Sequence, residues 1–176
     1  MTTERRTIEF HEAFKHPVRS NPTTLCREEA TLALALIEEE YLELVDALFP
    51  KVRQDIRSNH SSMTPVEWLR LQDEEYAQDV EDGLVDEDWF ADCRPKYEPD
   101  LIATADALAD LDVVINGAGI RHGFDMQSLS REVFTSNMSK LGADGKPIYH
   151  PNGKIAKGPG FKEPDIASAL GLALIG

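Results

Sequence analysis

The longest helical pattern of apolar and polar residues in this chain covers residues 25–49. The stretch contains no internal Gly or Pro, and Pro50 stops it. Its apolar residues cover most of the circumference, which is typical of a helix buried on several sides, in a bundle or a subunit interface. Residues 101–122 show a second pattern of this kind. The chain therefore predicts two long core helices.

The remaining segments carry weaker patterns. Residues 8–24 begin as a short helix and end in a Pro/Asn/Ser turn. Residues 50–100 are polar. Residues 131–176 predict a short helix, a Gly/Lys-rich stretch at 142–160 and a weak final helix. We expect the polar block to dock through three aromatic anchors: Trp68, Trp89 and Phe90.

Charge and length narrow the class of protein. The chain has 176 residues, 32 acidic against 18 basic, and a formal net charge of −14. This balance argues against nucleic-acid or anionic-membrane partners. The N-terminus lacks the apolar core of a signal peptide, and no apolar run has bilayer length. Cys26 and Cys93 form no C-x-x-C pair, which favours reduced thiols. We expect one cytoplasmic domain spanning residues 1–176.

Acidic residues interrupt both core helices. Glu39, Glu40 and Glu43 share a face of the first helix, and Asp106 and Asp110 share a face of the second. Two such clusters on buried helices repel each other unless cations lie between them. Hard divalent ions with oxygen ligands, Mg²⁺ above all, are the usual solution. The alternative is a solvated acidic stripe on an amphipathic helix.

Four stretches resemble a known superfamily when read in order. "LIEEEYLEL" is similar to the E-E-x-x-E helix of the all-α nucleoside triphosphate pyrophosphatases, the MazG-like and phosphoribosyl-ATP pyrophosphohydrolase-like proteins. "DALADLDVVINGAGIRHGFD" resembles their second metal helix. "FHEAFKHPVRSNPT" and "SNMSKLGADGKPIYHPNGKIAKGPGFKEPDI" resemble phage and bacterial members. The resemblance implies an all-α helical bundle of the MazG-like type. Residues 50–100 make the chain longer than the family's compact members and therefore look like an insertion.

The same resemblance implies the metal ligands. The second motif is usually E-x-x-D, but Ala107 stands at the Glu position and Asp106 precedes it. We expect Mg²⁺, with Mn²⁺ as a substitute, at about two or three ions per site. Catalysis would fall to Glu39, Glu40 and Glu43, with Glu39 accepting a proton from the attacking water. The expected ligands are Glu39, Glu40, Glu43, Asp106 and Asp110.

The C-terminal stretch offers positive charge. Asn152-Gly153 is a two-residue turn signal and predicts a small β-hairpin. Lysine acts as a compact charge for phosphate, and glycine allows close approach of the backbone. The alternative is a solvated hairpin whose lysines balance the acidic surface. The expected phosphate-binding residues of this stretch are Lys146, Lys154 and Lys157. The resemblance adds Asn137 and Lys140, which lie in the stretch that family members place near the substrate.

These expectations combine into a Mg²⁺-dependent enzyme that converts a (d)NTP to (d)NMP and pyrophosphate. Phe14 and Asn21, with Phe10, are the expected base-binding wall. We favour a purine deoxynucleotide, dGTP first, with dUTP or phosphoribosyl-ATP as alternatives. An acidic DNA mimic is the alternative from another class. It predicts acids spread over one surface, whereas the enzyme interpretation predicts all five acids buried between the two helices. The apolar first helix predicts a homo-oligomer, and the resemblance suggests a tetramer built as a dimer of dimers, in the host cytoplasm if phage-encoded.

Two other motifs compete. "DVVINGAGIRHG" resembles a strand followed by a dinucleotide-binding loop, but the chain after Gly123 is too short for the βαβ unit that such a loop requires. "HEAFKH" resembles a zinc helix, yet His11 and His16 are five residues apart and point in different directions on a helix. We expect both histidines to serve packing or capping.

Overall fold

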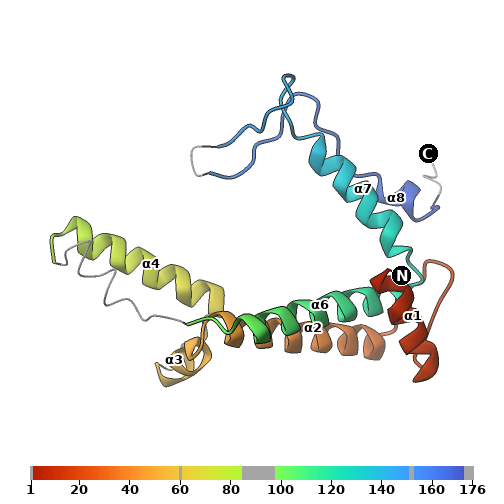
Figure 1. Ribbon diagram of the computed structural model, residues 1–176, viewed down its shortest axis with the longest axis horizontal. Helices are drawn as coiled ribbons and strands as arrows, with labels where there is room; N and C mark the ends of the chain where they lie inside the picture. Colours follow the sequence, from red (N-terminus) through yellow and green to blue (C-terminus); the bar gives the residue numbers. More distant parts are fainter. Residues whose placement is uncertain (1, 60, 85–97, 151–152, 173–176) are drawn as a thin grey trace. The chain divides into compact units, whose positions relative to one another are not determined.

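The computed structural model describes residues 2–59, 61–84, 98–150 and 153–172 (Figure 1). Within these ranges the chain forms seven α-helices and no β-strand. The all-α prediction is therefore confirmed. None of the helices in these ranges is long and apolar enough to cross a membrane. The helices are α1 (Thr3–Ala13), α2 (Arg27–Leu48), α3 (Val52–Ser58), α4 (Pro65–Glu81), α6 (Leu101–His122), α7 (Met126–Met138) and α8 (Ile166–Ala169).

The chain divides into two compact units. One joins Met1–Ala33 to Val113–Gly176, and the other is Leu34–Asp112. Helices α2 and α6 each contribute residues to both units. The expectation of a single domain over residues 1–176 stays a prediction.

In the unit Leu34–Asp112, α2 and α6 lie side by side (Figure 1). The N–H of Asp100 donates to the carbonyl of Ala47 at 2.9 Å, which ties the start of α6 to the end of α2. The Asp100 side chain then caps α6 by accepting from the N–H groups of Ile102 and Ala103. Val52, the first residue of α3, is fully buried. These contacts hold the acid-bearing faces of the two helices near each other.

In the described part of residues 50–100, two helices belong to the same unit. α3 packs against α4. Thr64 and Glu67 form a reciprocal capping box at the start of α4, with Pro65 in the first turn. Trp68 is half-buried, as expected of an anchor, but its indole N–H has no acceptor among the described residues. The other two anchors, Trp89 and Phe90, lie outside the described residues.

In the other unit, α1 docks on the C-terminal half of α6. Thr7 and His11 are buried, and a Cβ added at Gly117 would come within 3.1 Å of His11 Nε2. A Cβ at Gly119 would meet the Met126 side chain. These glycines are therefore packing positions inside a helix, and the dinucleotide-loop alternative is wrong. The burial of His11 confirms its expected packing role.

α6 ends in a glycine cap. Gly123 has φ +74°, and the N–H of Phe124 reaches back to the carbonyl of Gly119 at 3.0 Å. This is the Schellman arrangement, which requires a residue that tolerates positive φ. The backbone of Asn21 lies against Gly123, because a Cβ there would come 2.1 Å from the Asn21 carbonyl oxygen. The loop between α1 and α2 is thereby fixed on the end of α6.

The predicted β-hairpin is not supported. The described residues of this stretch contain one isolated antiparallel bridge, between Tyr149 and Ile155, and no strand. Two backbone hydrogen bonds flank it, from His150 to Lys154 and from Ala156 to Ile148. A two-stranded ladder this short is marginal without a sheet or helix to pack on. The turn residues 151–152 lie outside the described residues.

Candidate active site

Glu39, Glu40 and Glu43 of α2 and Asp106 and Asp110 of α6 lie in one unit, Leu34–Asp112. Glu40 is half-buried, whereas the other four residues are exposed. The expectation that all five acids lie buried between two helices is therefore wrong for this chain. Glu40 Oε2 is buried and has no hydrogen-bond partner among the described residues.

The electrostatics of Glu40 link the two helices. Burial raises the pKa of Glu40, and the nearby charges of Asp110, Glu43, Glu39 and Asp106 raise it further, in that order. All five predicted ligands therefore interact in this structure. A buried carboxylate surrounded by other carboxylates favours a proton or a cation beside it.

The donor set fits a hard cation in its chemistry. All five groups are carboxylates, which Mg²⁺ and Mn²⁺ prefer, and the unpartnered Glu40 Oε2 is an oxygen that a cation would satisfy. In the part of the chain that the structure describes, however, no three His, Cys, Asp or Glu side chains converge closely enough to form a ready metal site. Side-chain rearrangement would therefore accompany metal binding.

Two of the predicted phosphate-binding residues contact each other in the unit that contains the chain's end. Lys140 Nζ donates to Asn137 Oδ1 at 2.7 Å. Lys140 follows α7, and its carbonyl accepts from the N–H of Gly158, where a Cβ would clash with backbone. Asn137 and Lys140 therefore lie on a segment that is held in place by the Gly/Lys-rich stretch.

The other lysines are more dispersed. Lys157 pairs with Glu163 at 2.8 Å and lies over the Phe161 ring, 4.2 Å from its centroid. Lys146 and Lys154 are exposed. Lys157 must leave or share its carboxylate partner before it can bind phosphate.

The predicted base wall lies at the end of α1. Phe14 is 65% exposed and packs beside Phe10 with ring centroids 4.6 Å apart. Asn21 lies in the adjoining loop, on Gly123. The sequence patterns did not single out Arg121, which is 5% exposed and contacts His16 in this neighbourhood. The helical pattern does not distinguish Arg121 from a solvent-exposed basic residue at the end of a helix.

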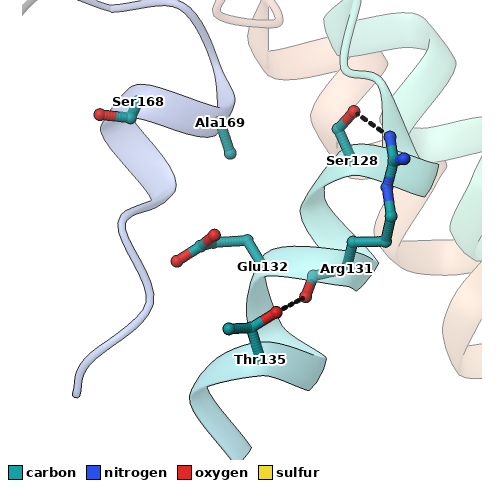
Figure 2. Close-up of a pocket in the computed structure, with 6 residues that line it drawn as sticks. All are labelled: Ser128, Arg131, Glu132, Thr135, Ser168 and Ala169. Carbon is teal, nitrogen blue, oxygen red and sulfur yellow. Dashed lines mark hydrogen bonds between the residues drawn. The ribbon is translucent and has the colours of Figure 1, made fainter.

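A surface pocket of about 390 Å³ lies elsewhere in this unit, between α7 and α8 (Figure 2). Arg131 in its wall donates to Ser128, and its carbonyl accepts from Thr135. It contains none of the predicted site residues. It is lined by Ser128, Arg131, Glu132, Thr135, Ser168 and Ala169.

The described chain is all-α, and five carboxylates from two long helices interact around Glu40. A family model described as phosphoribosyl-ATP pyrophosphohydrolase matches residues 7–137, which include all five acids. The chain belongs to this family, within the MazG-like superfamily, and is a pyrophosphohydrolase. The lysines after position 137 lie beyond the matched region.

Two other comparisons complete the picture. The chain resembles the crystal structure of a candidate NTP pyrophosphohydrolase from Exiguobacterium sp. 255-15, with a TM-score of 0.40 and 21% identity, over 97% of this chain and 95% of that chain. A comparison with curated proteins gave no match. The family match alone therefore carries the assignment, and it favours an enzyme over the DNA-mimic alternative.

Proposed function

We propose that the protein hydrolyses a nucleoside triphosphate, with dGTP as the first choice, to the monophosphate and pyrophosphate. The family match supports the reaction class. The observation that carries the site is Glu40 Oε2, a buried oxygen that has no hydrogen-bond partner in the described part of the chain and lies among four other carboxylates. Such an arrangement is unfavourable in the free chain and becomes favourable when positive charge enters.

We propose Mg²⁺, with Mn²⁺ as a substitute, as the source of that charge. The residues that would hold it are Glu39, Glu40, Glu43, Asp106 and Asp110. When bound, Mg²⁺ would supply positive charge against the triphosphate and would make water more acidic. Glu39 is exposed and would accept the proton of the attacking water.

Lysines would bind the phosphate oxygens as negative charge develops on them. Lys140 is the first of these, because Asn137 orients its ammonium group. Lys146, Lys154 and Lys157 would contribute further charge. Phe14 and Asn21 would contact the base.

A homo-oligomer, with a tetramer built as a dimer of dimers favoured, is part of the proposal. The two long helices leave large apolar side chains uncovered in the unit Leu34–Asp112: Leu34 is 68% exposed, Leu101 81% and Ile102 83%. A second copy would cover such surface. Light scattering at micromolar concentration tests this, and a stable monomer contradicts it.

The function is tested by incubating the protein with dGTP, dATP, dUTP and phosphoribosyl-ATP, each with Mg²⁺, Mn²⁺ or EDTA. We expect monophosphate and pyrophosphate from dGTP, no turnover in EDTA, and loss of turnover in Glu43→Gln. Glu38→Gln is the matched control, because Glu38 is exposed on the same helix and is not among the groups that raise the pKa of Glu40. Full activity of Glu43→Gln, or turnover in EDTA, contradicts the site.

A further inference from the structure

Arg121 is a buried cation with no acidic partner. It is 5% exposed, and no carboxylate among the described residues lies within ion-pair distance of it. The nearby acid Glu29 forms an ion pair with Arg19, and the Arg19 guanidinium also donates to the Arg121 carbonyl. This is unusual in a chain with 32 acids against 18 basic residues, because a buried charge normally requires a partner.

An exposed histidine contacts this guanidinium. His16 Nδ1 lies 3.3 Å from Arg121 Nη2, and His16 is exposed. His11 lies beside His16, with ring centroids 5.4 Å apart, but its Nδ1 already contacts the Pro17 carbonyl. An incoming acceptor would therefore compete with one imidazole nitrogen for the guanidinium.

An exposed aromatic surface adjoins the same histidine. The Phe10 ring is nearly parallel to His16, at 15° with centroids 6.2 Å apart, and packs on Phe14. Phe10 is 48% exposed and Phe14 65%. Large aromatic rings exposed beside a donor group are the two parts of a nucleobase site, one for stacking and one for the base edge.

The chemistry of arginine selects the base. Its guanidinium carries five N–H donors and no acceptor, so it matches an edge with two adjacent acceptors. O6 and N7 of guanine form such an edge, whereas adenine places an amino donor at position 6. We infer that Phe10, Phe14, His16 and Arg121 form a binding site for a 6-oxopurine base, with Arg121 donating to O6 and N7. This inference rests on the proposed hydrolysis of purine nucleotides and names the group that selects among them.

The competing explanation is structural. Arg121 lies in the last turn of α6, where a cation is stabilised by the helix dipole. A purely structural arginine would change thermal stability when replaced, but it would leave the order of preference among bases unchanged. Base preference is therefore the readout that separates the two explanations.

The test measures kcat/KM for dGTP, dITP and dATP with wild type, Arg121→Lys and Arg121→Met. dITP retains O6 and N7 but lacks the 2-amino group. We expect wild type to use dGTP and dITP similarly and dATP at least about tenfold less well. Replacing Arg121 should lower the values for dGTP and dITP by about 5- to 150-fold, the range of one bidentate base contact, and leave dATP unchanged. Arg131→Met is the matched control, because Arg131 is exposed in the same unit.

A binding measurement separates this inference from the proposed reaction. Calorimetric titration with dGMP and dAMP in EDTA reports on the base alone. Arg121-dependent preference for dGMP without any triphosphate hydrolysis would support the base site and contradict the proposed function. If the protein hydrolyses the triphosphates but the Arg121 variants lower kcat/KM equally for all three substrates, or lower only the Tm, the inference is overturned and the proposed function stands. A wild-type preference for dATP or dUTP also overturns it.

Phe14→Leu keeps the test decisive if the Arg121 variants do not fold. Phe14 is a surface side chain, so its replacement should not disturb the core. Loss of stacking should weaken dGMP and dAMP by about tenfold each, because every base has a π-face. Unchanged binding of both nucleotides by Phe14→Leu would overturn the inference.

Discussion

Replacing Glu40 with glutamine should stabilise the metal-free protein and abolish its activity. Glu40 Oε2 is buried and finds no hydrogen-bond partner among the residues that the structure describes, and burial together with the four neighbouring carboxylates raises the Glu40 pKa. Glutamine keeps the shape of the side chain and removes the charge. Its amide N–H groups can donate to the neighbouring carboxylates, which glutamate cannot do. The variant therefore relieves both the desolvation and the like-charge repulsion.

The size of the effect follows from these two terms. A buried polar group without a partner costs about 1–3 kcal/mol. Because Glu40 is only half-buried, the lower end applies, and we expect a gain of about 1 kcal/mol in the free energy of unfolding. For a chain of this size that corresponds to a rise in Tm of about 2–4 °C.

The pH dependence gives a second check. The folded-state pKa of Glu40 lies above the ordinary value of 4.5, so the folded chain holds the proton where the unfolded chain has released it. This group therefore lowers the stability of wild type as pH rises from about 4.5 through the raised pKa. The Tm difference between Glu40→Gln and wild type should be full at pH 8 and should shrink toward pH 4.5.

Calorimetry in EDTA measures both effects, with Glu38→Gln as the control for loss of a single negative charge. Adding Mg²⁺ should raise the Tm of wild type and leave that of Glu40→Gln nearly unchanged, because a ligand stabilises only the state that binds it. A Glu40→Gln variant with a lower Tm than wild type at pH 8 in EDTA would refute the reasoning.

Three further variants probe the unit around the C-terminal half of α6. Burial lowers the pKa of His11 below 6.5; a hydrogen bond to the Pro17 carbonyl opposes this, and the charges of Arg121 and His16 lower the pKa further. The stability of the folded protein should therefore fall as pH drops from 6.5 through that lowered pKa. His11→Gln should remove this pH dependence in a series of Tm measurements. Gly123→Ala should lower the free energy of unfolding, measured by urea titration, by about 2 kcal/mol or more, because Gly123 has a positive φ and lies against the backbone of Asn21. Gly160 has open space around it, so Gly160→Ala should be near neutral in the same titration. Ser136→Ala removes a buried hydroxyl that donates to the Lys162 carbonyl at 2.8 Å, and it should cost about 1 kcal/mol in urea; an unchanged midpoint would contradict that contact's role.

The long helices were predictable because their patterns are local. The second core helix was expected at residues 101–122 and is observed as Leu101–His122. The first was expected at 25–49 and runs from Arg27 to Leu48. Helical spacing also grouped the acids of each helix on one face, since residues three and four positions apart share a face. By contrast, α1 begins at Thr3, five residues before the expected start at residue 8, because its polar first turn carries no apolar signal.

Tertiary contacts were beyond the reach of spacing. The helical pattern does not distinguish Glu40 from its exposed neighbours, because its burial depends on what α6 places opposite it. From the sequence, Arg121 resembles an ordinary basic residue at a helix end. Only the structure shows that the nearby acid Glu29 pairs with Arg19 instead. The Asn152-Gly153 signal overstated the hairpin, since a turn does not supply the partner layer that a ladder requires.

The glycines within α6 constrain the size of the side chains that pack against them from distant positions of the chain. Gly117 leaves room for His11, and Gly119 leaves room for Met126. A mutation that adds bulk at either glycine is tolerated only if its opposite residue becomes smaller or moves. In an alignment of homologues we therefore expect positions 11 and 117 to covary in side-chain volume, and positions 119 and 126 likewise. Engineered swaps of His11 for larger aromatics should fail for the same reason, whatever their effect on catalysis.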